Sequence, residues 1–210
     1  MQRSDVHVYV FDTMADWEVG HAIGHINTPD FQKHPDRYHV RSVGRTREPI
    51  TTTGGLRVTP ELTLAELTPT DSAMLILPGG SSWDRTHDDV RAVEAARAFV
   101  KAGVPVAAIC GGTSGLARGG LLDDRAHTSN AKEYLEHQPG YHGAANYREE
   151  RAVADRGVIT AGSTAAVDFA RAIFAVLDIY EKSVLDAWYG LFSTGDAKYF
   201  HQLMRALQAK

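Results

Sequence analysis

The chain has 210 residues, of which 43% are hydrophobic and 23% charged, an ordinary globular composition that can bury a core without disulfides. The net charge is −4 with both signs interspersed, so the sequence offers no basic block for nucleic acid or an anionic membrane surface. One cysteine excludes an internal disulfide framework, and no signal-peptide core or membrane span is seen; we expect a cytoplasmic protein.

Strand-like and helix-like segments alternate along the chain. Apolar, β-branched runs predict strands at 6–11, 38–43, 73–77, 104–109 and 157–160. Helical patterns cover 16–27, 88–101, 113–118 and 165–176, followed by a helical tail from 182 to about 191 and again beyond 196. This alternation is typical of a parallel sheet with helices on both faces. We therefore expect an α/β fold, a three-layer α/β/α sandwich with a mainly parallel sheet.

Residues 49–58 interrupt this alternation. The segment predicts a small hairpin, with Gly54 and Gly55 in its turn, at an edge of the fold. No internal repeat or Pro/Gly-rich linker divides the chain, so we expect one domain over residues 1–210.

Unusual loops follow three of the predicted strands. They are 12–18 after the first strand, 78–83 after the third, and Cys110 after the fourth. Ligands of open parallel sheets bind at the carboxyl ends of strands, so these loops should converge on one cleft. Trp17 and Trp83 flank the loops, where aromatic rings either wall a pocket or simply pack.

Cys110 stands between the apolar run 104–109 and a helix that can start at Gly111 and Gly112. Small neighbours leave room for a nucleophile at such a strand-to-helix corner. A helix N-terminus also favours the thiolate over the thiol. A free cysteine is often only a small buried hydrophobe, but the corner position favours a functional thiol.

The order of Glu18, Gly79–Gly80 and the run 108–112 resembles the ThiJ/PfpI family of the class I glutamine amidotransferase-like superfamily. Segments 147–150 and 155–163, with the helix that follows, extend the likeness over most of the chain. The resemblance implies a flavodoxin-like sandwich, Cys110 on a nucleophile elbow, Glu18 near its sulfur, and a homodimer.

Two chemical roles accompany this arrangement. A protonated Glu18 would donate a hydrogen bond to the thiolate, whereas an ionised Glu18 would raise the pKa of the thiol by repulsion. The backbone N–H groups of Gly80 and Gly111 are candidates for stabilising a developing oxyanion. Gly79 and Gly80 also have a simpler reading as turn formers after a strand.

The chain departs from the family pattern around the cysteine. Hydrolytic members often place a histidine directly after it, where this chain has Gly111, so peptidase activity is in doubt. Members related to the Parkinson-associated deglycase/glyoxalase carry a histidine farther along, and Asn130 stands there instead. Asparagine can orient a substrate but takes no proton, so His127 is the nearest candidate base, or Glu18 acts alone. We expect Asn130 and Ser163 to shape the substrate end.

Rival motifs are weak. Glu18, His21 and His25 share a helical spacing that metal ligands use, but a further ligand is not apparent, so we expect no metal. Dinucleotide and phosphate-loop glycine patterns are absent, and we expect no cofactor.

The leading hypothesis is a cysteine-dependent enzyme, of hydrolase or lyase type, in which Cys110 attacks a small carbonyl, amide or nitrile-like substrate and Glu18 moves the proton. An alternative is a redox-responsive or protective protein that senses oxidants through Cys110. A glutamine amidotransferase-like role is a third, disfavoured because residues 147–155 offer no His-x-Glu pair.

Overall fold

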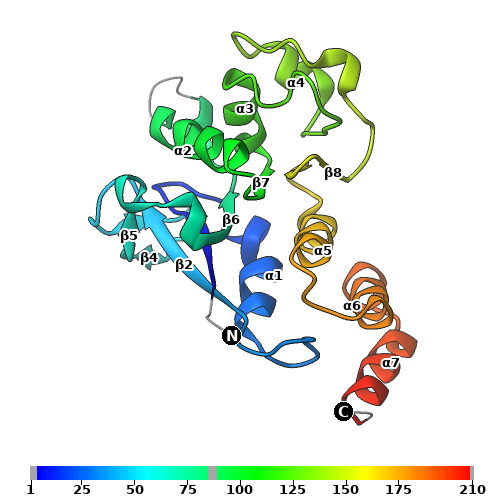
Figure 1. Cartoon of the computed structure of the whole chain (residues 1–210). Coiled ribbons are helices and arrows are strands. Elements are labelled where there is room, and N and C mark those ends of the chain that lie inside the picture. Colours follow the sequence, from blue (N-terminus) through cyan, green and yellow to red (C-terminus); the bar gives the residue numbers. More distant parts are fainter. Residues whose placement is uncertain (1–3, 85–88, 209–210) are drawn as a thin grey trace.

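The computed structural model describes residues 4–84 and 89–208 (Figure 1). Its strands are β1 (Ser4–Tyr9), β2 (Tyr38–Gly44), β3 (Ile50–Thr51), β4 (Arg57–Val58), β5 (Leu62–Thr63), β6 (Ser72–Leu77), β7 (Val106–Ile109), β8 (Ala152–Asp155) and β9 (Val158–Ala161). The α-helices are α1 (Asp16–Asn27), α2 (Val90–Lys101), α3 (Gly111–Arg118), α4 (Lys132–Glu136), α5 (Ala166–Val176), α6 (Lys182–Thr194) and α7 (Ala197–Gln208). Short 3₁₀ turns are η1 (Leu64–Glu66), η2 (Pro69–Asp71), η3 (Ser81–Asp84) and η4 (Ala144–Asn146).

Seven strands form the main sheet in the order β5-β2-β1-β6-β7-β9-β8. All neighbouring pairs are parallel except β8 and β9, which are antiparallel. The five inner strands, β2-β1-β6-β7-β9, have the order of flavodoxin-like folds. Residues 74–77 of β6 and all of β7 are fully buried, as in parallel sheets covered on both faces.

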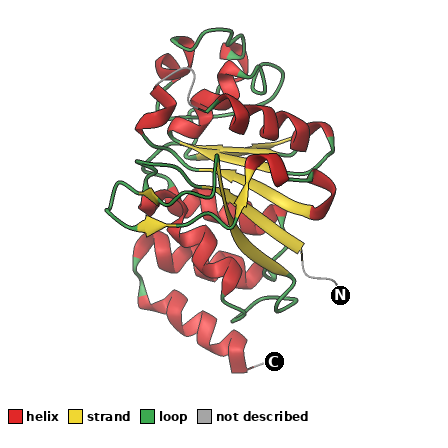
Figure 2. Cartoon of the chain, turned by 90° about the vertical axis from the view of Figure 1, so that its left-hand side faces the viewer, coloured by secondary structure: helices red, strands yellow, loops and turns green. Residues whose placement is uncertain are grey.

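Helices cover both faces of this sheet, which Figure 2 shows between two helical layers. Helices α2 and α3 pack on each other and on β6 and β7, whereas α1 and α5 pack together on the opposite face. Helix α6 lies against α5, and α7 lies against α6. The three-layer, mainly parallel sandwich predicted from the sequence is confirmed.

The sequence prediction misses some short elements and finds the hairpin. Strands β5 and β8 and helix α4 are absent from it, and the predicted start of the second helix at residue 88 lies outside the described residues. The predicted hairpin is present, outside the main sheet. Strands β3 and β4 form a separate two-stranded sheet, and Thr13 and Gly54 donate backbone hydrogen bonds to Thr51 O and Asp16 Oδ2 (2.9 and 2.6 Å). The hairpin therefore supports the loop after β1.

The side chain of Trp83 packs against α3. It is fully buried, and its Nε1 donates to the Pro78 carbonyl at 2.8 Å. A Cβ atom built on Gly115 would lie 2.2 Å from Trp83 Cζ3, so only glycine lets α3 rest on the indole.

Gly115→Ala should therefore destabilise the protein, since overpacking costs about 1–3 kcal/mol and outweighs the roughly 0.5–1 kcal/mol that alanine contributes to a helix. Gly24→Ala is the matched control, because a Cβ on that α1 glycine meets nothing within 4 Å and should stabilise. Urea unfolding of both variants measures the difference; equal free energies of unfolding would contradict this role for Gly115.

Candidate functional site

Cys110 is the single residue between β7 and α3, in a backbone conformation that side chains rarely adopt. Its φ and ψ are 55° and −122°. Such conformations cost of order 1–3 kcal/mol and persist only where neighbours enforce them. Here the Cys110 N–H donates to Ala161 O at 2.9 Å, and the Cys110 carbonyl accepts from Thr113 N (3.1 Å) and Oγ1 (2.6 Å). These bonds hold the thiol at the carboxyl edge of the sheet.

Glu18 brings a buried carboxyl to this corner from the first turn of α1. The residue is 1% exposed, and its Oε2 accepts the Gly79 N–H at 2.6 Å. Its Oε1 is also buried and has no hydrogen-bond partner among the described residues. A Cβ on Gly79 would lie 2.6 Å from Glu18 Oε2 and 2.9 Å from Cys110 Sγ, so the carboxyl and the sulfur both border the space that a side chain at Gly79 would occupy.

Burial sets the acidity of both groups. Burial raises the pKa of Glu18, whereas hydrogen bonds from Gly79 and Cys110 lower it by less. Burial also raises the pKa of Cys110 to about 11, with a further contribution from the Glu18 charge. Asn130 and the Gly111 N–H act in the opposite direction. Desolvation and the neighbouring carboxylate thus act against the thiolate that a helix N-terminus favours.

Alkylation of Cys110 by iodoacetamide should therefore accelerate about tenfold per pH unit from roughly pH 7 to 10, since only the thiolate reacts and its pKa is raised. No plateau is expected below the pKa of about 11. Intact mass follows the reaction without interference, because the chain has one cysteine. A midpoint below that of a free thiol, roughly 8.5, would contradict the buried, carboxylate-flanked environment.

Asn130 and Ser163 meet at the same corner. The Asn130 Nδ2 donates to Cys110 Sγ at 3.4 Å, and its Oδ1 accepts the Ser163 N–H at 2.8 Å. The second bond fixes which end of the amide faces the sulfur. Both residues line a cavity of about 300 Å³, together with Tyr147 and Arg151 among others.

His127 is turned away from the thiol chemistry. It is fully buried, its Nδ1 bonds to Arg125 O (2.8 Å), and its Nε2 bonds to the Tyr141 hydroxyl (2.7 Å). Burial lowers its pKa, so the neutral ring is favoured. With both ring nitrogens occupied, no atom of His127 is free to take a proton from Cys110.

Neither tryptophan lines the cavity next to Asn130. Trp83 is buried beneath α3, where its ring contacts the Gly111 position, and Trp17 is 56% exposed on α1. Gly80 lies against Phe11 and Thr13, and its carbonyl accepts the backbone N–H of Trp83 at 3.3 Å. The glycine loop thereby connects the indole to the cysteine corner.

The histidines near Glu18 serve packing. The rings of His21 and His25 stand edge-on against Trp188 and Phe192, with centroids 5.1–6.2 Å apart. Among residues 4–84 and 89–208, no group of three or more His, Cys, Asp or Glu side chains is placed to hold a metal ion. Within the same described ranges, no helix has the length and apolarity to span a membrane.

The fold and this corner together define a class of protein: a flavodoxin-like sandwich with a cysteine at the strand-to-helix corner and a buried glutamate beside it. The chain belongs to the DJ-1/PfpI family, whose model matches residues 4–176. This agrees with the resemblance seen in the sequence.

Individual relatives extend this finding. The "Uncharacterized protease YoaZ" of Bacillus subtilis is 37% identical over 99% of both chains. The crystal structure of a thiJ/pfpI family protein from Bacillus anthracis has a TM-score of 0.91 and 39% identity over 98% of each chain. The "Glutathione-independent glyoxalase DJR-1.2" of Caenorhabditis elegans is 26% identical over 69% of this chain and 76% of its own. Shorter matches, spanning less than half of the relative, are to proteins named deglycases.

Proposed function

We propose that the protein is a cysteine-dependent enzyme acting on a small carbonyl compound, with Cys110 as nucleophile and Glu18 as proton carrier. The observation that carries this proposal is the buried Glu18 carboxyl, held by the Gly79 N–H beside the only thiol of the chain. The raised pKa of Glu18 makes its carboxylate a stronger base than an exposed one, and its position next to the thiol lets it take the thiol proton.

The first chemical step is an addition. Glu18 accepts the thiol proton, the sulfur lone pair forms a bond to the carbonyl carbon, and the π electrons of the C=O bond move to its oxygen. The N–H groups of Gly111 and Gly80 are our candidates to hold that negative oxygen until Glu18 returns the proton to it. A thiohemiacetal results, with no oxidant or cofactor consumed.

The surroundings favour a small polar substrate. The cavity next to Asn130 measures about 300 Å³ and is lined mostly by polar groups, including Glu149 and Ser163; Cys110 is not one of its lining residues and is linked to it through Asn130. The Asn130 amide, already 3.4 Å from the sulfur, can donate to a second oxygen of the substrate. The relatives named glyoxalase and deglycases also point to carbonyl chemistry. A 1,2-dicarbonyl such as methylglyoxal is therefore the first test substrate.

The test compares methylglyoxal with acetamide and acetonitrile, each followed by NMR in the presence of the protein. Consumption of methylglyoxal alone supports a carbonyl enzyme. Turnover of only the amide or only the nitrile would show that the substrate is not a carbonyl compound of this kind. Consumption of none of the three compounds would count against the proposal.

Three other expectations stay predictions. Oxidant sensing through Cys110 stays an alternative, which mass spectrometry after mild peroxide would test by showing whether the thiol is oxidised. The glutamine amidotransferase-like role lacks a base, since both ring nitrogens of His127 are engaged. The homodimer is tested by the molar mass in solution from light scattering.

A further inference from the structure

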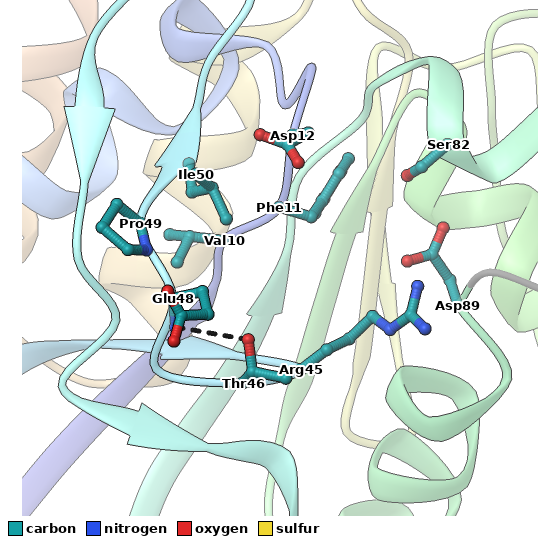
Figure 3. A pocket seen from close by; sticks show the side chains of 10 residues that line it. All are labelled: Val10, Phe11, Asp12, Arg45, Thr46, Glu48, Pro49, Ile50, Ser82 and Asp89. Carbon is teal, nitrogen blue, oxygen red and sulfur yellow. Dashed lines mark hydrogen bonds between the residues drawn. The ribbon is translucent and has the colours of Figure 1, made fainter.

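A second pocket opens where β1 and β2 end, apart from the cysteine corner (Figure 3). It measures about 310 Å³, and neither Cys110 nor Glu18 lines it. Val10, Phe11, Ser82 and Asp89 form its buried part, and the exposed residues of its mouth are Asp12, Arg45, Thr46, Glu48 and Pro49. The pocket lies at the carboxyl ends of the strands, the edge at which open α/β sheets bind ligands.

Asp89 faces this pocket with an unused oxygen. The residue is 3% exposed; its Oδ1 accepts the Tyr9 hydroxyl at 2.7 Å, while its Oδ2 is buried without a hydrogen-bond partner in the described part of the chain. An aspartate directly before a helix ordinarily caps it. Asp89 precedes α2, yet its side chain makes no capping hydrogen bond. Helix capping therefore does not explain this carboxylate.

Ser82 adds a second unused group on the same wall. It is 8% exposed, and its Oγ has no hydrogen-bond partner among residues 4–84 and 89–208. Figure 3 shows the Ser82 hydroxyl and the Asp89 carboxylate directed into the same space. A buried polar atom left unpaired costs about 1–3 kcal/mol, which a ligand with hydrogen-bond donors would recover.

Charge and surface decide the ligand class. Three carboxylates, Asp12, Glu48 and Asp89, line the pocket against one guanidinium, that of Arg45, which Figure 3 shows extended toward Asp89, and most of the other lining residues are apolar. We propose that this pocket binds a small organic cation, a primary ammonium group on a short aliphatic chain. The ammonium donates to Asp89 Oδ2 and Ser82 Oγ, and the chain lies against Val10 and Phe11.

The test titrates the ¹⁵N-labelled protein with butylammonium, 1-butanol and butyrate, which share a chain and differ in charge. Butylammonium alone should give saturable shifts at residues of the pocket. Asp89→Asn keeps an acceptor for Tyr9 and an equally good residue before α2, so it should fold while weakening binding roughly tenfold or more, as expected for losing one charge-assisted hydrogen bond. Ser82→Ala should weaken binding less.

Two controls separate this site from other causes. Glu94→Gln removes an exposed carboxylate of α2 outside this pocket and should leave the affinity unchanged. Cys110→Ser should also bind normally, since the pocket does not include the thiol. Equal binding of butanol, unchanged affinity in folded Asp89→Asn, or no saturable binding because only water occupies the pocket would each overturn the proposal.

Discussion

Replacing Cys110 by serine should lower the turnover of methylglyoxal by at least about 10³-fold, because a hydroxyl beside Glu18 is a far weaker nucleophile than a thiol. The loss should appear in kcat, since the cavity beside the corner is unchanged and substrate binding is largely retained. The rate of dicarbonyl disappearance, followed by NMR, measures it.

The sequence makes the result of this test easy to interpret, because Cys110 is its one cysteine. No second cysteine can substitute, so residual activity in the variant reports chemistry that does not use sulfur. Serine keeps the backbone bonds of the corner, and thermal unfolding of both proteins shows whether the fold is intact. Wild-type turnover by a folded Cys110→Ser variant would reject Cys110 as the nucleophile.

Glu18→Gln should change the acidity of Cys110 and the turnover in opposite directions. The amide can still accept the Gly79 N–H, but it carries no charge and no exchangeable acid proton. Removing the charge that raises the pKa of Cys110 should lower that pKa, so alkylation near neutral pH becomes faster. Turnover should nevertheless fall by roughly 10²–10⁴-fold, the usual contribution of a positioned acid or base.

Opposite movement of these two rates is the signature of Glu18 as proton carrier. Glu94→Gln, which removes an exposed carboxylate of α2, controls for the change in net charge and should alter neither rate. Slower alkylation in Glu18→Gln would mean that Glu18 is protonated and donates to a thiolate. Unchanged turnover would exclude the carboxyl from the reaction.

The parts of this molecule that local pattern encodes were predictable from sequence. Helix α1 has the predicted bounds, and the apolar run before Cys110 followed by two glycines places the strand-to-helix corner. Strand β8 was missed because it is four residues long, mixes polar and apolar side chains, and is defined by antiparallel pairing with β9.

Site properties that depend on tertiary packing were beyond the sequence. The bond from Asn130 to Cys110 joins residues twenty positions apart, and its geometry follows from how Ser163 holds the amide. The raised pKa of the thiol reflects how deeply the fold buries it. The support that the hairpin gives to residues 13–16 was also beyond the sequence, because these bonds join segments far apart in the chain and form only once it is folded.

The missing side chain of Gly79, whose place Glu18 and Cys110 both border, bears on how such a site changes over evolutionary time. Any side chain at Gly79 would collide with both reacting groups, so this wall of the site is backbone. A substitution at this position therefore cannot change which substrates the site accepts. New substrate preferences must then arise at positions whose side chains reach the cavity from the other side, such as Asn130 and Tyr147. Descendants of this chain can diversify in what they accept while the attacking sulfur and its acid partner stay where they are.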